Sequence, residues 1–213
     1  MRTRLKICGV RDADTAHAAA EHGADAVGFV FVEKSPRYIT PEDAWPIVQT
    51  LPPFVMSVGL FVNASVDDYA DAEQLCPTDF GQLHGSEKEK TVRACGPRLI
   101  KAVTFNPNTI ANDLRFWSGI DEVDAVLVDG SAGGEGTALD WGALAEAQDA
   151  CEKPLILAGG LTPENVGEAI AAVRPYAVDV SSGVESERGV KDLAKIAAFG
   201  AAVRAADAAL RST

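Results

Sequence analysis

Eight short apolar runs recur along the chain, and helical segments separate them. Most of the runs are continuous rather than alternating in polarity, which is typical of strands that are covered on both faces. The expected strands lie at residues 5–8, 26–31, 56–61, 80–84, 99–103, 125–129, 155–159 and 177–181. The amphipathic, Ala-rich stretches between them predict helices, among them 12–22, 41–50, 163–173 and 192–210.

This alternation of strand and helix predicts a parallel sheet with right-handed crossovers. The chain has 213 residues, so eight repeats leave little length for insertions, and no linker or low-complexity segment marks a second domain. A closed sheet therefore follows more naturally than an open one. We predict a single-domain α/β protein over residues 1–213, a (β/α)8 TIM barrel. In such barrels the carboxyl ends of the strands and the loops after them build the active site.

Charge and composition narrow the classes of partner. The formal net charge of -12 disfavours nucleic acid and anionic membranes, and no apolar run approaches membrane-spanning length. The amino terminus lacks the apolar segment of a secretory signal. Four widely spaced cysteines and three histidines make a poor set for a metal site or a disulfide framework. We expect a cytoplasmic protein with free thiols and no metal, either a monomer or a homodimer.

The first two strands lead into two candidate site residues. Cys8 places a thiol at the mouth of the barrel, before a glycine that permits close approach of a ligand. A lone cysteine is more often a small buried apolar residue. Pro36 stiffens the next loop, which presents Arg37, whose planar fork suits a carboxylate; an ordinary solvated arginine is the alternative. The other cysteines fall on expected helices or loops and are interpreted as structural: Cys76, Cys95 and Cys151.

Polar residues also end the fourth and sixth strands. Gln82 and His84 share one face of the fourth strand, and His84 fits either a hydrogen-bonded structural role or proton transfer. Asp129 closes an apolar strand, where an idle carboxylate would be costly to bury. It is therefore a candidate catalyst, with a helix cap as the alternative. The Gly-rich loop that follows, with Gly134, indicates close approach of the backbone to a ligand.

The seventh and eighth strands run into glycine and serine residues. Gly159 and Gly160 follow one strand, and Ser182 and Gly183 follow the other. These are the two positions at which phosphate-binding barrels gather backbone N–H groups. The chain has no Walker sequence, so a nucleoside triphosphate is not indicated. The pattern predicts a small phosphorylated ligand.

Strand parity predicts one buried ion pair. Lys6 shares the face of Cys8, and Asp179 shares the face of Ser181. Because closure makes the first and eighth strands neighbours, we expect Lys6 and Asp179 to meet inside the barrel beneath the site. The lysine would then favour the thiolate form of Cys8.

Short sequence strings at the strand ends carry a family resemblance. In chain order they are KICGV, GFVF with SPRYI, VGLFVN, QLHG, VLVD with GGEG and DW, LAGGLTPENV, and VDVSSGVE with GVKD. Each string is modest alone, but their order and placement are very specific. On them the chain resembles the phosphoribosylanthranilate isomerase family along nearly its whole length.

The resemblance implies an Amadori rearrangement in tryptophan biosynthesis. The aminoaldose N-(5'-phosphoribosyl)anthranilate becomes 1-(o-carboxyphenylamino)-1-deoxyribulose 5-phosphate, without redox chemistry and hence without an organic cofactor. The resemblance also implies that Cys8 is the general base and Asp129 the general acid, while Arg37 holds the anthranilate carboxylate. The loops at 159–160 and 182–183 would hold the phosphate. The chain departs from the family pattern at Glu135, where threonine is usual, and at Leu139, where an aromatic residue is common.

Two alternatives stay open at this point. The first is another phosphosugar barrel, such as the isomerase of histidine biosynthesis or a bifunctional version. Resemblance to those enzymes would imply a pair of aspartates at the ends of the first and sixth strands, and here the first position is Cys8. The second is a barrel that only binds a phosphorylated ligand. Loss of Cys8, Asp129 or the phosphate loops would favour that interpretation, but the sequence has all of them.

Overall fold

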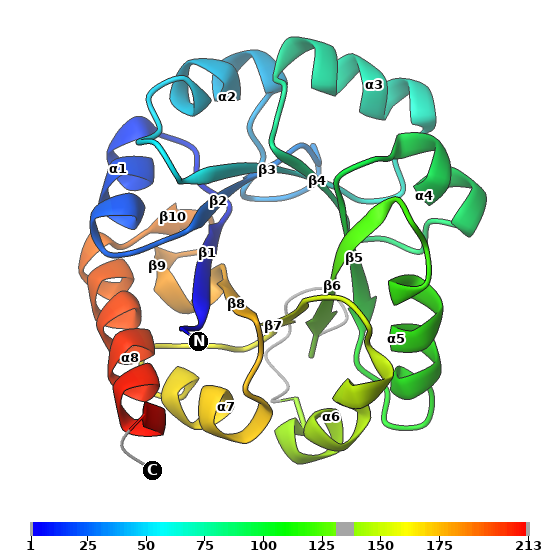
Figure 1. The fold of residues 1–213 in the computed structure, drawn as a ribbon. Coiled ribbons are helices and arrows are strands. Elements are labelled where there is room, and N and C mark those ends of the chain that lie inside the picture. The colour runs from blue at the N-terminus through cyan, green and yellow to red at the C-terminus, as the bar shows by residue number, and fades with distance from the viewer. Residues whose placement is uncertain (1, 131–138, 212–213) are drawn as a thin grey trace.

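The strands close into a parallel barrel in chain order. The computed structural model describes residues 2–130 and 139–211. Within these residues, eight strands pair in parallel with their chain neighbours, and the last pairs with the first (Figure 1). The predicted (β/α)8 barrel is therefore confirmed. The strands are β1 Arg4–Cys8, β2 Ala26–Val30, β3 Met56–Phe61, β4 Phe80–Leu83, β5 Leu99–Thr104, β6 Val123–Asp129, β7 Leu155–Ala158 and β8 Ala177–Val180.

Helices surround the barrel in a ring, one after each strand (Figure 1). Several begin where a side-chain oxygen accepts a backbone N–H of the first turn, as Asp12 does from Thr15. The helices are α1 Ala13–Glu21, α2 Pro41–Val48, α3 Val66–Leu75, α4 Glu89–Cys95, α5 Ile110–Ser118, α6 Trp141–Ala147, α7 Val166–Val173 and α8 Leu193–Arg211. The described part of the chain also has two short 3-10 helices, η1 Gln148–Ala150 and η2 Ser182–Val184.

The sequence placed the start of α7 three residues too early, at 163 instead of Val166. The reason is the side chain of Asn165. It accepts a hydrogen bond from the Thr162 N–H at 2.8 Å and donates to the Gly160 carbonyl at 2.9 Å. Asn165 thus braces the loop after β7 instead of extending the helix.

Two apolar layers explain why the strand runs are continuous. One layer fills the barrel interior, with Ile100, Leu127 and Ile156 among its members. A larger layer, including Ile7 and Phe199, lies between the strands and the helices. Buried polar groups break the interior pattern toward the carboxyl ends of the strands, and they include Lys6, Gln82 and Asp179. Because buried polar groups are costly unless paired, this part of the interior points to function.

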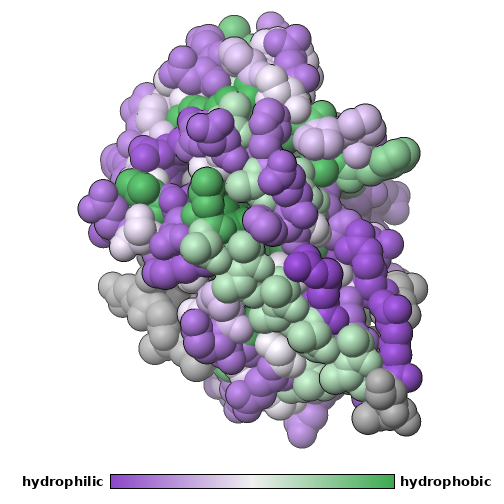
Figure 2. Space-filling view, turned by 90° about the vertical axis from the view of Figure 1, so that its left-hand side faces the viewer, coloured by the Kyte–Doolittle hydropathy of each residue, from purple (hydrophilic) through white to green (hydrophobic). Residues whose placement is uncertain are grey.

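The outer face over α1 and α8 is mostly hydrophilic. Figure 2 shows this face, with hydrophilic side chains on either side of a weakly hydrophobic band. The helix α8 lies on this side of the molecule and is rich in alanine, with Ala198 and Ala205 among its exposed residues (Figure 1). Among the described helices, none combines the length and the apolar character needed to cross a lipid bilayer.

The sequence did not predict a small hairpin after β8. Strands β9 Glu185–Glu187 and β10 Val190–Lys191 pair in antiparallel fashion between η2 and α8. A Cβ on Gly189, in the turn, would lie 2.4 Å from the Pro36 carbonyl oxygen. The hairpin therefore packs closely against the loop that carries Arg37.

Candidate active site

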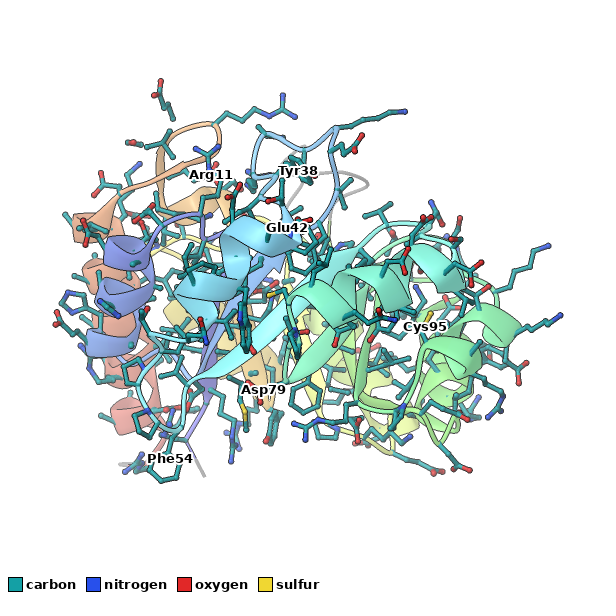
Figure 3. The ribbon with its side chains drawn as sticks, turned by 90° about the horizontal axis from the view of Figure 1, so that it is seen from above. Arg11, Tyr38, Glu42, Phe54, Asp79 and Cys95 are labelled. Carbon is teal, nitrogen blue, oxygen red and sulfur yellow. The ribbon has the colours of Figure 1, made fainter. Side chains whose placement is uncertain are left out.

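The carboxyl ends of the strands gather the polar groups at one end of the barrel. Figure 3 views the barrel from the side, with Arg11, Tyr38 and Glu42 at this end and Phe54 at the opposite end. Cys8 follows Lys6 on the interior face of β1, and Asp129 follows Leu127 on the interior face of β6. Both candidate proton carriers therefore belong to the same mouth.

A glycine on the neighbouring strand leaves room for the Cys8 thiol. Cys8 pairs in register with Gly28 of β2. A Cβ on Gly28 would lie 2.9 Å from the Cys8 Sγ and 3.2 Å from the Lys6 Nζ. Any larger residue would displace the thiol or the ammonium group. Gly28 is therefore part of the site, although the sequence analysis did not select it.

The predicted pair of Lys6 and Asp179 is confirmed. The two residues lie opposite each other in the β1–β8 register, and the Lys6 Nζ donates to the Asp179 Oδ1 at 2.9 Å. Both side chains are buried. Burial opposes the charge of Lys6, but Asp179 and then Cys8 outweigh it and raise the lysine pKa. Lys6 stays a cation directly beneath the thiol.

This cation does not by itself make Cys8 acidic. Burial raises the pKa of the Cys8 thiol, and the opposing effects of Lys6 and Lys191 do not outweigh it. Asp179 adds to the rise through its negative charge. The expected influence of Lys6 thus has the right sign but is smaller than the effect of burial.

Asp129 is held by a chain of polar groups from β4. The His84 Nε2 lies 3.2 Å from the Asp129 Oδ2, and the Gln82 Nε2 lies 2.7 Å from the His84 Nδ1. These contacts form one hydrogen-bonded chain from the Gln82 amide through the His84 imidazole to the carboxyl group of Asp129. The structure brings His84 to Asp129, where it orients the carboxyl group.

The two predicted phosphate loops lie against each other and beside Asp129. A Cβ on Gly159, whose φ is +91°, would lie 2.7 Å from the Asp129 Oδ1. A Cβ on Gly183 would lie 1.8 Å from the Leu161 carbonyl oxygen, so the loop after β8 touches the loop after β7. Gly160 has a φ of +65° and faces open space. At Gly159 the left-handed backbone and the close approach occur together, so only glycine fits there.

Arg37 is not a solvated loop residue. Its Nε and Nη2 donate to the two carboxylate oxygens of Glu185 at 2.6 and 2.9 Å. A Cβ on Gly9 would lie 2.8 Å from the Arg37 Cδ, so the arginine stem lies over the residue after Cys8. The hydrogen bonds to Glu185 raise the Arg37 pKa. Burial alone would lower it, and the negative charge of Glu185 adds to the rise. Arg37 thus enters the site as a fixed cation.

Glu185 and Lys191 complete this cluster, and neither residue was predicted from the sequence. The Lys191 Nζ donates to the Glu185 Oε1 at 3.0 Å and to the Ser181 carbonyl at 2.9 Å. Burial alone would raise the Glu185 pKa, but Arg37 and Lys191 lower it. Burial lowers the pKa of Lys191, and Glu185 offsets part of this. The only signal in the sequence was their place within the family-like strings VDVSSGVE and GVKD.

The loop after β6 lies largely outside the described residues, and the expected absence of a metal site can be compared only with the described part of the chain. Gly134 and Glu135 belong to residues 131–138, which the structure does not describe. Leu139 is buried, and a Cβ on Gly130 would lie 2.8 Å from its Cβ. In residues 2–130 and 139–211, no group of three or more His, Cys, Asp or Glu side chains could hold a metal ion.

Comparisons with known proteins agree on one family. The family model described as N-(5'phosphoribosyl)anthranilate (PRA) isomerase matches residues 5–202. An N-(5'-phosphoribosyl)anthranilate isomerase of Pseudomonas fluorescens is 48% identical over 203 residues, covering 94% of this chain and 98% of the relative.

Solved structures extend the likeness to the fold. A phosphoribosyl anthranilate isomerase in complex with reduced 1-(o-carboxyphenylamino)-1-deoxyribulose 5-phosphate has a TM-score of 0.84 and 41% identity, with 95% and 99% of the two chains covered. A monomeric form of the dimeric enzyme from Thermotoga maritima has a TM-score of 0.84 and 39% identity at the same coverage. The resemblance read from the strand-end strings is confirmed, and the chain is an isomerase that belongs to the N-(5'-phosphoribosyl)anthranilate isomerase family.

Proposed function

We propose that Cys8 and Asp129 catalyse the Amadori rearrangement of N-(5'-phosphoribosyl)anthranilate as general base and general acid. The observation that carries this proposal is their placement at one barrel mouth, on the interior faces of β1 and β6. Glycines at 28 and 159 leave room beside their reactive atoms. A substrate lying across the mouth would be flanked by both proton carriers.

Each carrier has one proton to move. Asp129 gives its proton to the ribose ring oxygen as the ring opens to a Schiff base. Cys8 then takes the proton from C2', and the resulting enolamine tautomerises to the ketone. His84 orients the acid through its hydrogen bond to Asp129, and Lys6, paired with Asp179, supplies positive charge beneath the base. The rearrangement needs no electron carrier, so we propose that the enzyme works without an organic cofactor.

The substrate has two anionic groups, and the mouth has two places suited to them. Backbone N–H groups of the loops at Gly159-Gly160 and Ser182-Gly183 suit the phosphate, since these loops meet after β7 and β8. Arg37 suits the anthranilate carboxylate, because a guanidinium can bind a second carboxylate on the edge that Glu185 leaves unused. The two anionic ends would thus be anchored away from the reacting carbon atoms.

A steady-state assay on freshly prepared phosphoribosylanthranilate tests this function. We expect anthranilyl fluorescence to change continuously with turnover, at a rate proportional to enzyme concentration. A fixed, stoichiometric signal would instead mark a binding protein. The aminoaldose substrate of the histidine-pathway isomerase serves as the comparison, and faster turnover of that compound would contradict the proposal.

We further propose that two copies of the chain associate through the amino-terminal end of the barrel. Phe54, in the loop before β3, is 95% exposed and has a φ of +74°, an uncommon conformation for an aromatic residue. A cavity of about 310 Å³ opens on the same end, lined by Phe54, Phe80 and Tyr176 among others. A two-fold axis would place each Phe54 at the cavity of the other copy, which would remove both apolar surfaces from water.

Sedimentation equilibrium distinguishes the two states. The unchanged chain is expected to sediment as a dimer, and Phe54→Glu as a monomer, because the shorter, charged side chain cannot fill the apolar part of the cavity that Phe54 would occupy. Phe116→Glu is the matched control, since Phe116 is also an exposed phenylalanine but lies on α5. A monomeric unchanged chain at micromolar concentration, or a dimeric Phe54→Glu, would refute this interface.

A further inference from the structure

We propose that Glu185 and Lys191 are positioning residues, which hold the Arg37 guanidinium so that its unused edge meets the substrate carboxylate. The inference rests on the proposed function, because it assumes that Arg37 binds the anthranilate group. It adds two residues from the hairpin β9–β10, which lies between η2 and α8 and far from Arg37 in the chain. Three observations support this proposal: the edge of the guanidinium that Glu185 occupies, the charge of the cluster and the contacts that hold it.

The first aspect is which edge of the guanidinium Glu185 occupies. The contacts at Nε and Nη2 use the side edge of the planar group. A guanidinium has five N–H donors, and this pairing leaves the end edge, formed by Nη1 and Nη2, for a second carboxylate. Since both bonds to Glu185 must stay in one plane, the pairing also fixes the direction of that end edge. Glu185 therefore acts on the substrate through Arg37.

The second aspect is charge. An isolated pair of Arg37 and Glu185 is neutral and would attract an incoming carboxylate weakly. The Lys191 Nζ contacts the Glu185 Oε1 at 3.0 Å, and its side chain is only 3% exposed. The three side chains together carry one net positive charge, which the substrate carboxylate would balance. Lys191 thus lets Glu185 orient the arginine without cancelling its attraction for an anion.

The third aspect is how firmly the cluster is held. The Gly189 N–H donates to the Glu185 Oε2 at 3.2 Å, and the hairpin turn packs against the Pro36 carbonyl. Lys191 also donates to the Ser181 carbonyl, and the Ser181 hydroxyl donates to the Cys8 carbonyl at 3.0 Å. The cluster is therefore tied both to the loop that carries Arg37 and to the end of β1. Such supporting contacts are what keeps a binding group in one geometry.

Two ligands that differ in a single group test the proposal. One is reduced 1-(o-carboxyphenylamino)-1-deoxyribulose 5-phosphate, and the other is the same compound without the carboxylate. Arg37→Ala should weaken the first ligand roughly 30- to 1000-fold, as loss of a paired charge does. Glu185→Gln and Lys191→Met should each weaken it roughly 10-fold. None of the three variants should change the Kd of the second ligand, which also shows that the site is folded.

Turnover and a double variant separate positioning from a structural role. Glu185→Gln should raise KM with little change in kcat, and Arg37→Ala/Glu185→Gln should be no weaker than Arg37→Ala, because Glu185 acts only through Arg37. Glu187→Gln, an exposed residue of the same strand, is the matched control and should change nothing.

The outcomes are distinguishable. If Glu185→Gln weakens both ligands equally, or weakens neither while Arg37→Ala weakens the first alone, the positioning role is overturned and the function of Arg37 stands. If Arg37→Ala leaves the Kd of the carboxylate ligand unchanged, the proposed carboxylate site itself is wrong, and the inference falls with it.

Discussion

Asp129→Asn is expected to lower kcat by roughly 10²- to 10⁴-fold, the range that a general acid contributes. The amide has nearly the same shape as the carboxyl group and can still form a hydrogen bond with the His84 Nε2. It cannot deliver an acidic proton to the ribose ring oxygen, so ring opening loses its catalyst. Binding of the reduced product analogue should stay within a few fold, because its carboxylate and phosphate are held elsewhere.

Asp124→Asn provides the matched control for this variant. Asp124 lies on the same strand but is exposed toward the opposite end of the barrel, so its neutralisation should leave kcat unchanged. The measurement is kcat, together with the Kd of the reduced product analogue, for the unchanged enzyme and both variants. A near-normal kcat in Asp129→Asn would remove its assigned role, and an equally collapsed Kd would identify a binding or folding residue instead of the acid.

The barrel could be predicted because its pattern is local and repeated. A strand between an apolar interior and a layer of helices needs apolar residues on both faces, and this appears in the sequence as eight continuous runs. Closure makes β1 and β8 neighbours, so parity and closure together predicted that Lys6 and Asp179 meet inside the barrel, and the observed register places them opposite each other. The ends of elements were less certain because single side chains decide them, as Asn165 does at α7.

The cluster around Arg37 could not be predicted for the opposite reason. Arg37 and Glu185 are separated by 148 positions, and the chain has 31 acidic residues that could have been its partner. The hairpin that carries Glu185 has strands of three and two residues, too short to show an alternating pattern. The sequence could therefore indicate that Arg37 binds a carboxylate, but not that the protein supplies one of its own.

Cys8→Ser is expected to abolish nearly all turnover, with a fall in kcat of roughly 10²- to 10⁴-fold or more. The general base must lose its proton before it can take the one on C2', and an alkoxide is far harder to form than a thiolate. The change of sulfur to oxygen is small, and the space opened by Gly28 accommodates both. The Kd of the reduced product analogue should therefore change little.

The ionisation of Cys8 gives an independent test of the same role. Cys8 must be a thiolate when it takes the C2' proton, but Asp129 must hold its own proton in the same complex, so the thiol is followed directly instead of through the rate. Because burial raises the thiol pKa, the fraction of thiolate should still be rising with pH above the usual thiol value of about 8.5. Lys6 opposes the effect of burial, so Lys6→Met should move this rise to still higher pH. The measurement is the ultraviolet absorbance of the thiolate against pH, taken as the difference between the unchanged enzyme and Cys8→Ser. A difference that is already complete at pH 7, or a Cys8→Ser variant with near-normal kcat, would contradict this account of the base.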